Sequence, residues 1–210
     1  MDKKGRFIVF EGIDGSGKST QIKLLSKALS ECGIPCIATL EPTFGVAGEV
    51  LHKILSGEFA ADPRVIASLF VSDRLDHLLN EENGICRTIN EGTTVLCDRY
   101  CFSSYAYQSV DVPTEWVIDC NRLCTEILRA DCTIFIDVSP ETAMQRISSN
   151  REHTEIYENT ERLTKVRDAY FKMFDRFGSE EKIFIVDGNA AASEIADKIA
   201  VYVKKNIFNM

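Results

Sequence analysis

The sequence predicts an α/β fold in which a five-stranded parallel sheet is covered by helices on both faces. Five short apolar segments rich in β-prone residues recur along the 210 residues, and helical patterns separate each from the next. These segments are almost continuously apolar rather than alternating, which is typical of strands buried on both faces. No repeat, low-complexity tract or linker interrupts the pattern, so we expect a single domain over residues 1–210.

The first strand and the loop after it, residues 7–20, have the sequence FIVFEGIDGSGKST. An apolar strand is followed by the pattern G-x-x-x-x-G-K-S and then by an amphipathic helix. In such loops glycines let backbone N–H groups approach a polyphosphate, Lys18 reaches the β- and γ-phosphates, and Ser19 supplies a hydroxyl to Mg²⁺. The alternative is a glycine turn with a chance lysine. The residues predicted to hold nucleotide phosphates are Gly12, Gly15, Ser16, Gly17, Lys18, Ser19 and Thr20.

Residues typical of helix caps and turns predict where the remaining helices and strands begin and end. Gly33 ends the first helix, because glycine commonly follows the last turn of a helix. Asp62 and Pro63 combine an N-cap residue with a first-turn proline, so they begin a longer helix. The expected strands are 7–11, 34–40, 93–97, 133–138 and 182–186. Helices are expected from the loop to Gly33, at 46–55, from 62 to about 81, at 114–128, from 140, at 159–177 and around 195–203.

Phe70 and Arg74 lie four residues apart in the helix that begins at Asp62, so they share one of its faces. An aromatic ring can stack on a base while a guanidinium one turn away holds the phosphate of the same nucleotide in a bidentate contact. The alternative is a core ring beside a solvated arginine. The pair by itself does not decide between them.

The third strand is followed by Asp98-Arg99-Tyr100. A carboxylate at the C-terminal end of a buried strand, beside the loop strand, is where a water-bound Mg²⁺ is held in related chemistry. The alternative for Asp98 is a helix N-cap. Ser19 and Asp98 are therefore the candidate metal residues. The next segment, 103–108, is polar and aromatic, and we expect it to line a pocket rather than the core.

The apolar pattern lapses over residues 148–157, SSNREHTEIY, beside Arg146 and around Arg151. One interpretation is a solvated loop between two helices. The other is a mobile lid, at about 146–158, that brings positive charge over bound phosphates.

Composition limits the possible functions. A formal net charge of −8 argues against a nucleic-acid or anionic-membrane surface, since either requires a basic field. The start, MDKKGRF, has no apolar signal region and no segment is long enough to span a membrane, so we expect a cytoplasmic protein. The eight cysteines form no C-x-x-C pair. We expect them to be reduced core residues rather than metal ligands or disulfides.

With these motifs in view, residues 7–189 resemble a thymidylate kinase of the nucleoside monophosphate kinase group. The loop alone indicates only phosphate binding. The loop followed by Glu41-Pro42, by Phe70 and Arg74 as F-x-x-x-R, and by DRY and AYQ at 98–100 and 106–108 is specific to that family. The resemblance implies a P-loop nucleoside monophosphate kinase fold. It also implies transfer of the γ-phosphoryl group of ATP to dTMP, giving dTDP and ADP, with Mg²⁺ as cofactor and a homodimer as the assembly.

On the acceptor side, the resemblance implies that Phe70 stacks on thymine while Arg74 and Arg99 hold the acceptor phosphate. It places Asp14, inside the loop, near the acceptor sugar and phosphate. Tyr107 lies where a ribose 2′-hydroxyl would fall. The residues implied near the base are Ser104 and Gln108.

On the donor side, the resemblance places Arg146 and Arg151 at the basic positions of the lid, with Arg146 nearer adenine. Some thymidylate kinases carry an arginine in the phosphate loop at the position of Gly15. Because Gly15 has no side chain, we expect Arg151 to supply the catalytic charge on lid closure, together with Lys18 and Arg99. A second departure is Leu40, which replaces an arginine found in many bacterial relatives.

Other functions share part of this pattern. A kinase for dUMP, UMP or a deoxynucleoside has the same loop and lid chemistry, although a nucleoside acceptor does not need Arg74 and Arg99 together. A nucleotide-gated switch or motor ATPase shares only the loop. Such a protein needs a partner surface and a water-activating residue, for which the sequence offers no candidate.

Overall fold

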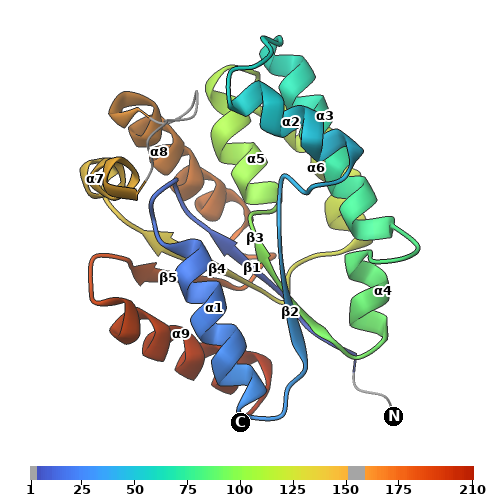
Figure 1. The fold of residues 1–210 in the computed structure, drawn as a ribbon, viewed down its shortest axis with the longest axis vertical. Coiled ribbons are helices and arrows are strands. Elements are labelled where there is room, and N and C mark those ends of the chain that lie inside the picture. The colour runs from blue at the N-terminus through green and yellow to red at the C-terminus, as the bar shows by residue number, and fades with distance from the viewer. Residues whose placement is uncertain (1–3, 151–158) are drawn as a thin grey trace.

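A computed structural model describes residues 4–150 and 159–210. Within these residues the chain forms a sheet of five parallel strands in the order β2-β3-β1-β4-β5. Figure 1 shows helices on both sides of this sheet. The strands are β1 (Phe7–Glu11), β2 (Cys36–Leu40), β3 (Thr94–Asp98), β4 (Cys132–Asp137) and β5 (Ile183–Asp187). The predicted fold class is confirmed.

The two faces of the sheet are covered by different helices. One face packs against α1 (Lys18–Ser30) and α9 (Ala192–Ile207). The other packs against α3 (Pro63–Leu79), α4 (Ile85–Asn90), α5 (Cys101–Tyr107), α6 (Thr114–Ile127), α7 (Pro140–Asn150) and α8 (Thr160–Phe177). Helix α2 (Val46–Leu55) packs on α3, and the short 3₁₀ helix η1 (Gln108–Val110) follows α5.

Strand β1 contributes to both cores, because successive side chains of a strand point to opposite faces of the sheet. Phe7 and Val9 lie in the core beneath α5 and α8. Ile8 and Phe10 lie in the core beneath α1 and α9. All four side chains are buried, which explains why the sequence of this strand is apolar without alternation.

The predicted helix start at Asp62 is confirmed by its cap. The Asp62 side chain accepts a hydrogen bond from the backbone N–H of Arg64 at the start of α3. The predicted end of that helix, about residue 81, is two residues too late, because α3 ends at Leu79. The sequence analysis also missed α4. A helix of six residues is too short to show a 3.6-residue period.

The segment 103–108 is only partly pocket lining. It lies in α5 and the start of η1, and all of its residues are buried. Tyr105, Ala106 and Tyr107 belong to the core, so the prediction of pocket rather than core is wrong for Tyr105 and Ala106, whereas Tyr107 packs in the core and also lines a pocket. Ser103, Ser104 and Tyr107 lie on the other face of the same helix. A helix separates neighbouring residues between two faces, and the polar composition of the segment concealed that division.

All eight cysteines are free. Cys97, Cys101, Cys124 and Cys132 are buried as expected, whereas the other four are partly exposed. In the portion of the chain that the structure describes, no helix combines the length and the apolar character needed to cross a membrane.

The sheet register brings the loops of the site together. Phe10 of β1 pairs with Asp98 of β3 on one side and with Ile134 of β4 on the other. Because the strands are parallel, their carboxyl ends meet at one edge of the sheet. The loop after β1 therefore lies beside Asp98 and Arg99, at the strand edge where α/β proteins bind ligands.

Candidate active site

The phosphate loop joins β1 to α1, and its shape depends on glycine. Gly15 has a φ of 77° and Gly17, the N-cap of α1, has a φ of 97°. Both values lie in the left-handed region that residues with a Cβ avoid. A Cβ on Gly15 would also lie 2.5 Å from the carbonyl oxygen of Ala143 in α7. The loop backbone therefore fits its turn and its packing only with glycine at position 15.

Lys18 folds back over this loop and is almost fully buried. Its Nζ donates hydrogen bonds to the carbonyl oxygens of Gly12 at 3.1 Å and Ile13 at 3.3 Å. It also lies 3.9 Å from Oδ1 of Asp98. Burial lowers the pKa of Lys18, and the charge of Arg99 lowers it further, while neighbouring carboxylates oppose both effects. The lysine thus sits as a buried cation at the loop.

Ser19 and Asp98 are in direct contact, although 79 residues separate them in sequence. The Ser19 hydroxyl donates to Oδ2 of Asp98 at 2.8 Å. Oδ1 of Asp98 is buried and accepts no hydrogen bond from the residues that the structure describes. Helix α5 begins at Cys101 with Tyr100 as its N-cap, so Asp98 is not a helix cap. A hydroxyl beside a carboxylate with a spare oxygen is a donor set that suits Mg²⁺.

Arg99 lies between the phosphate loop and the neighbouring pocket. Its backbone has a φ of 77°, which is uncommon for a residue other than glycine and is typical of functional sites. Its Nη2 lies 2.6 Å from Oδ1 of Asp14, and its Nη1 donates to the Gly12 carbonyl at 3.3 Å. Burial alone would raise the pKa of Asp14, but the charges of Arg99 and Lys18 hold that pKa below its usual value. The guanidinium also lies 4.8 Å from the centre of the Tyr107 ring.

A pocket, the central pocket, opens between the phosphate loop and helices α2, α3 and α5. About 470 Å³ of space free of protein atoms lies within its outline, part of it open to solvent. The seven residues predicted on the acceptor side all line it: Asp14, Phe70, Arg74, Arg99, Ser104, Tyr107 and Gln108. Ser103, in the segment expected to line a pocket, lines it as well, and three further lining residues were not assigned to a pocket from the sequence: Glu41, Pro42 and Leu55.

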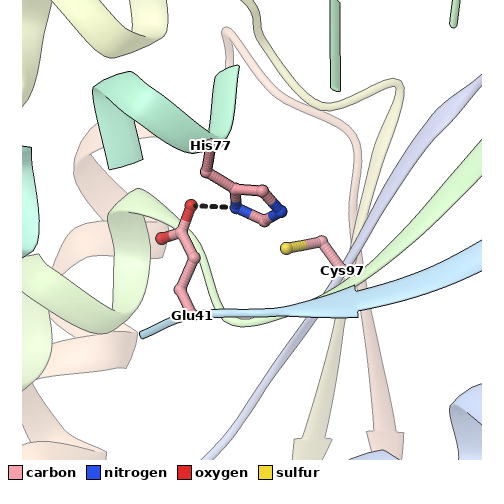
Figure 2. A group of neighbouring side chains, drawn as sticks. All are labelled: Glu41, His77 and Cys97. Atoms are coloured by element: carbon pink, nitrogen blue, oxygen red, sulfur yellow. Dashed lines mark hydrogen bonds and ion pairs between the residues drawn. The ribbon is translucent and has the colours of Figure 1, made fainter. Parts of the chain in front are cut away.

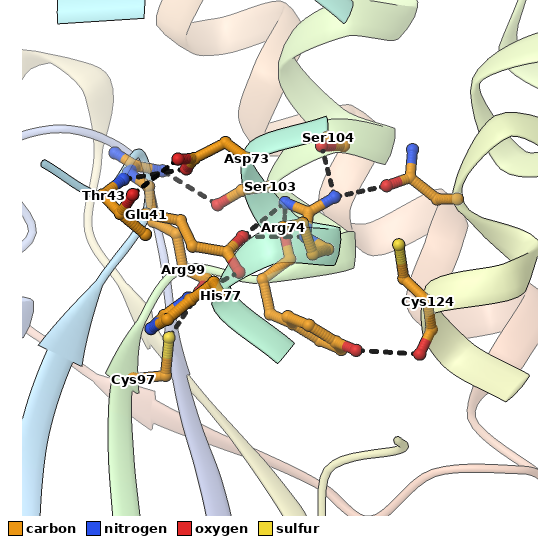
Figure 3. Close-up of polar contacts among 12 residues, drawn as sticks. Glu41, Thr43, Asp73, Arg74, His77, Cys97, Arg99, Ser103, Ser104 and Cys124 are labelled. Carbon is orange, nitrogen blue, oxygen red and sulfur yellow. Dashed lines mark hydrogen bonds and ion pairs between the residues drawn. The ribbon is translucent and has the colours of Figure 1, made fainter. Parts of the chain in front are cut away.

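Arg74 is 1% exposed, and protein groups occupy its whole guanidinium. Nε and Nη2 each lie 2.7 Å from Oε2 of Glu41. Nη1 donates to Ser104 Oγ at 3.0 Å and to Oδ1 of Asn121, and Nη2 donates to the Tyr100 carbonyl at 3.0 Å. Figure 3 shows Arg74 between Glu41 and Ser104. The guanidinium is therefore held by the residue that directly follows β2, by α5 and its N-cap residue, and by α6.

The two arginines of the central pocket thus differ in their surroundings. Arg99 contacts the phosphate loop, whereas Arg74 contacts α5 and α6 at the other end of the pocket. The sequence analysis expects both to hold the acceptor phosphate. The contacts of Arg74 leave no nitrogen for that role unless a protein bond breaks, so the arrangement favours Arg99 for the phosphate.

Two polar groups in the central pocket are available to a ligand. Oε1 of Gln108 is buried and accepts no hydrogen bond from the described residues. Ser104 Oγ accepts from Arg74, and the described residues contain no acceptor for its own proton. Two residues that line the pocket together with Phe70 therefore retain one unused acceptor and one unused donor.

Arg146 lies on the other side of the phosphate loop, on α7. Its Nη2 donates to the Gly188 carbonyl at 2.9 Å and its Nη1 to the Ser16 carbonyl at 3.4 Å. Gly188 directly follows β5, so Arg146 is on the β4–β5 side of the loop, away from the central pocket. Helix α7 continues to Asn150, so the first part of the expected lid is helical. Arg151 lies outside the described residues.

The sequence analysis missed the residues that hold Arg74. Glu41 was noted only as part of a family motif, and Asn121 and His77 were not noted at all. Glu41, His77 and Cys97 also approach one another, with ligand-type atoms within 4.8 Å (Figure 2). For Glu41, the only feature visible in the sequence was a glutamate before a proline at the end of a strand. Asn121 lies 47 residues from Arg74, so no local pattern connects the two.

The chain is similar to known proteins over most of its length. The family model of thymidylate kinase matches residues 10–199. The thymidylate kinase of Leptospira interrogans is 36% identical over 197 residues, which cover 94% of this chain and 93% of that protein. The probable thymidylate kinase of Methanocaldococcus jannaschii is 37% identical over 203 residues, covering 94% and 95% of the two chains. The thymidylate kinase of Ligilactobacillus salivarius is 36% identical over 202 residues, covering 92% and 95%. The chain belongs to the thymidylate kinase family.

Proposed function

We propose that this chain transfers the γ-phosphoryl group of ATP to dTMP, giving dTDP and ADP, with dTMP bound in the central pocket. The observation that carries the proposal is the position of that pocket. It adjoins the phosphate loop and is lined by all seven residues expected to contact the acceptor. Phosphoryl transfer requires little covalent chemistry from the protein, so placing two nucleotides in line and neutralising their charge accounts for most of the catalysis.

The base of dTMP occupies the end of the central pocket farther from the phosphate loop. Phe70 lines this end and stacks on the thymine ring. The thymine N3–H is a donor that fits the unpartnered Oε1 of Gln108. A thymine carbonyl is an acceptor that fits the proton of the Ser104 hydroxyl. These complementary pairs leave the 5′-phosphate directed toward the loop.

The acceptor phosphate lies beside Arg99, between the central pocket and the phosphate loop. Asp14 and Tyr107 hold the guanidinium there, and the Tyr107 hydroxyl donates to Oδ2 of Asp14 at 2.8 Å. Lys18 exchanges its bonds with the loop carbonyls for contacts with the donor phosphates. Because both cations are buried, they stabilise the charge of the transition state more than they would in water.

We also propose that Ser19 and Asp98 hold Mg²⁺, Ser19 directly and Asp98 through bound water. The buried Oδ1 of Asp98 and the adjacent Ser19 hydroxyl support this assignment. When bound, Mg²⁺ would neutralise charge on the donor phosphates. Ser19 and Asp98 would hold it beside Lys18.

On the donor side we propose that Arg146 lies near adenine and that residues 146–158 act as a lid, within a single domain of 210 residues. The contacts of Arg146 with both the loop and the end of β5 support the first assignment. Arg151 is proposed as the lid arginine that stabilises the transferring phosphoryl group.

We further propose a cytoplasmic homodimer. Eight free cysteines suit a reducing compartment. Val46, Val50 and Leu69 line a groove between α2 and α3, and Phe44, Val46 and Val65 are exposed apolar side chains in the same region. Exposed apolar patches of this kind often mark protein interfaces. Light scattering coupled to size-exclusion chromatography tests the dimer, and a Val46→Glu variant should shift it toward monomer.

The test of the function is a coupled assay of ADP release with Mg²⁺, ATP and a panel of acceptors: dTMP, dUMP, UMP, thymidine or none. We expect turnover to require a monophosphate and to be fastest with dTMP. Lys18→Ala should remain folded and lower kcat by roughly a hundred- to a thousand-fold, since it removes charge from the transition state. If turnover were fastest with another acceptor, that acceptor would replace dTMP as the proposed substrate. If ADP were released equally fast with and without an acceptor, the kinase assignment would be rejected.

A further inference from the structure

We propose that His77 and Glu41 are positioning residues for acceptor recognition, because they fix Arg74 so that Arg74 orients the Ser104 hydroxyl into the central pocket. The inference rests on the proposed function of that pocket and extends acceptor recognition to a residue outside it. Glu41 is one of the residues that line the pocket, whereas His77 is not.

The residues form a continuous chain of hydrogen bonds from β2 to the pocket. Thr39 Oγ1 lies 2.7 Å from Nε2 of His77, and Nδ1 of His77 lies 3.1 Å from Oε1 of Glu41. Figure 2 shows the second of these contacts. Oε2 of Glu41 then accepts from Arg74, whose Nη1 donates to Ser104 Oγ at 3.0 Å. Figure 3 shows the last link. We call these five residues the relay.

The direction of each hydrogen bond follows from the chemistry of its groups. A carboxylate only accepts, so Nδ1 of His77 carries a proton toward Glu41. A guanidinium only donates, so Arg74 supplies the proton in its bond with Ser104. Ser104 Oγ is therefore the acceptor there, and its own proton must be donated elsewhere. In the described residues Ser104 donates to no protein group, and Ser104 is one of the residues that line the central pocket.

The directions of the hydrogen bonds in the relay depend on the buried ion pair of Arg74 and Glu41. Arg74 and Glu41 are 1% and 3% exposed, so each charge relies on the other and on hydrogen bonds to its remaining atoms. Both Glu41 oxygens are used, one by Arg74 and one by His77. If His77 is lost, Oε1 is left without its partner. The carboxylate can then rotate, which releases the guanidinium and the hydroxyl that the guanidinium orients.

Two relay residues, Glu41 and His77, also form a cluster with Cys97 whose residue types are those that bind zinc. Their ligand atoms are already used in hydrogen bonds. Cys97 Sγ donates to the Arg99 carbonyl at 3.1 Å, and burial raises the pKa of this thiol well above its ordinary value. A divalent cation would also lie next to the buried charge of Arg74. The geometry therefore points to a relay of protein hydrogen bonds.

The experiment measures the Kd of dTMP and, separately, of ATP by titration calorimetry. His77→Leu should raise the Kd of dTMP about tenfold, the loss expected for one buried hydrogen bond, and leave the Kd of ATP unchanged. His77→Asn, whose amide can donate from the place of Nδ1, should restore the Kd of dTMP to within about twofold. In a Ser104→Ala background, His77→Leu should change the Kd of dTMP by less than about twofold, because the two residues act through one contact.

His52→Leu is the matched control. Like His77, His52 is partly buried. Its Nε2 lies 3.1 Å from the carbonyl oxygen of Thr43, and His52 does not line the central pocket. This variant should leave both Kd values unchanged. If His77→Leu does not fold, Thr39→Val removes only the outer link and should raise the Kd of dTMP about two- to threefold.

Equal losses for dTMP and ATP, or effects of His77→Leu and Ser104→Ala that simply add, would overturn the relay. So would one equivalent of zinc in the purified protein that disappears in Cys97→Ala. Wild-type protein that does not bind dTMP would overturn both the relay and the proposed function. Wild-type binding of dTMP that His77→Leu leaves unchanged would overturn the relay alone.

Discussion

Arg99 and Asp14 form an ion pair across 85 residues of sequence, with Nη2 of the arginine 2.6 Å from Oδ1 of the aspartate. The pair joins the end of β3 to the phosphate loop. It therefore fixes a cation at the boundary between the donor loop and the central pocket. Two anionic phosphates can approach each other there only if such a charge is already in place.

Arg99→Ala should lower kcat by roughly a hundred- to a thousand-fold and raise the KM for dTMP, because it removes a cation from the point where the phosphates meet. The KM for ATP should change little. Steady-state kinetics with each substrate varied in turn measures this. Arg129→Ala is the control, since Arg129 is a partly exposed arginine that pairs with Glu180. A normal kcat in Arg99→Ala would remove Arg99 from the catalytic residues.

Phe70→Ala should weaken dTMP binding by about 1–3 kcal/mol, as the loss of base–aromatic stacking does in other nucleotide complexes. ATP binding should be unchanged, because the ring lines the central pocket, where the acceptor is proposed to bind. Calorimetric titration with each nucleotide separates the two effects. Equal weakening of both would mean that the ring is only part of the core.

Tyr107 should crowd a ribose 2′-hydroxyl, so the enzyme should prefer a deoxyribonucleotide over the ribonucleotide of the same base. Its hydroxyl is held in place, since it donates to Oδ2 of Asp14 at 2.8 Å and accepts from the backbone N–H of Asp14 at 2.9 Å. The ratio of kcat/KM for dUMP and UMP measures the preference with the base held constant. A ratio of one would contradict the sugar-discrimination role of Tyr107 without affecting the kinase assignment.

The two arginines assigned to the lid should have separable effects. Arg151→Ala should lower kcat far more than it raises either KM, if its contact forms only in the closed state. Arg146→Ala should mainly raise the KM for ATP, because Arg146 contacts the phosphate loop and the end of β5. Steady-state kinetics on both variants measures kcat and the KM for each substrate and so separates the two effects. An unchanged kcat in Arg151→Ala would transfer the catalytic role to Arg146 or Arg99.

Glu181 should make folding stability depend on pH. Burial raises the pKa of this carboxyl to about 7, against the opposing charge of Arg129. The pKa in the folded state lies above the value in the unfolded state, so the protonated carboxyl contributes its full stabilisation of the folded state at low pH. This stabilisation is lost as the pH rises from about 4.5 through about 7.

Glu181→Gln should therefore raise Tm relative to the wild type at pH 8 and have little effect at pH 5. Calorimetric scans at the two pH values measure the difference. Glu180→Gln, which changes an exposed neighbour that also pairs with Arg129, is the control and should show no such pH dependence. A constant difference in Tm between Glu181→Gln and the wild type would mean that the carboxyl has an ordinary pKa.

Much of the fold is visible in the sequence, because burial on both faces of a sheet leaves a continuously apolar strand. Strand β1 and helix α2 have the bounds that their residue patterns predict. The phosphate loop is equally visible, since its glycines and Lys18 must occupy fixed positions along the chain. Short elements such as α4 were missed, because six residues do not establish a period.

The division of α5 between core and pocket was also beyond the sequence. Tyr105 and Tyr107 are both buried tyrosines in one helical segment, yet only Tyr107 lines the central pocket. Which face of the helix meets a cavity is set by what packs against it. In this protein α8 covers one side and the phosphate loop borders the other.

The sequence by itself determined the chemistry that this protein can perform, namely phosphate binding at the loop and the residue types that recognise a nucleotide. Only the tertiary structure decided how the two arginines differ. Arg74 is enclosed by Glu41 and Asn121, which lie 33 and 47 residues away along the chain, whereas Arg99 pairs with the phosphate loop. A motif records residues at fixed spacing on one element. The partners of a buried charge come from several elements, and only their packing determines which atoms are left for a ligand.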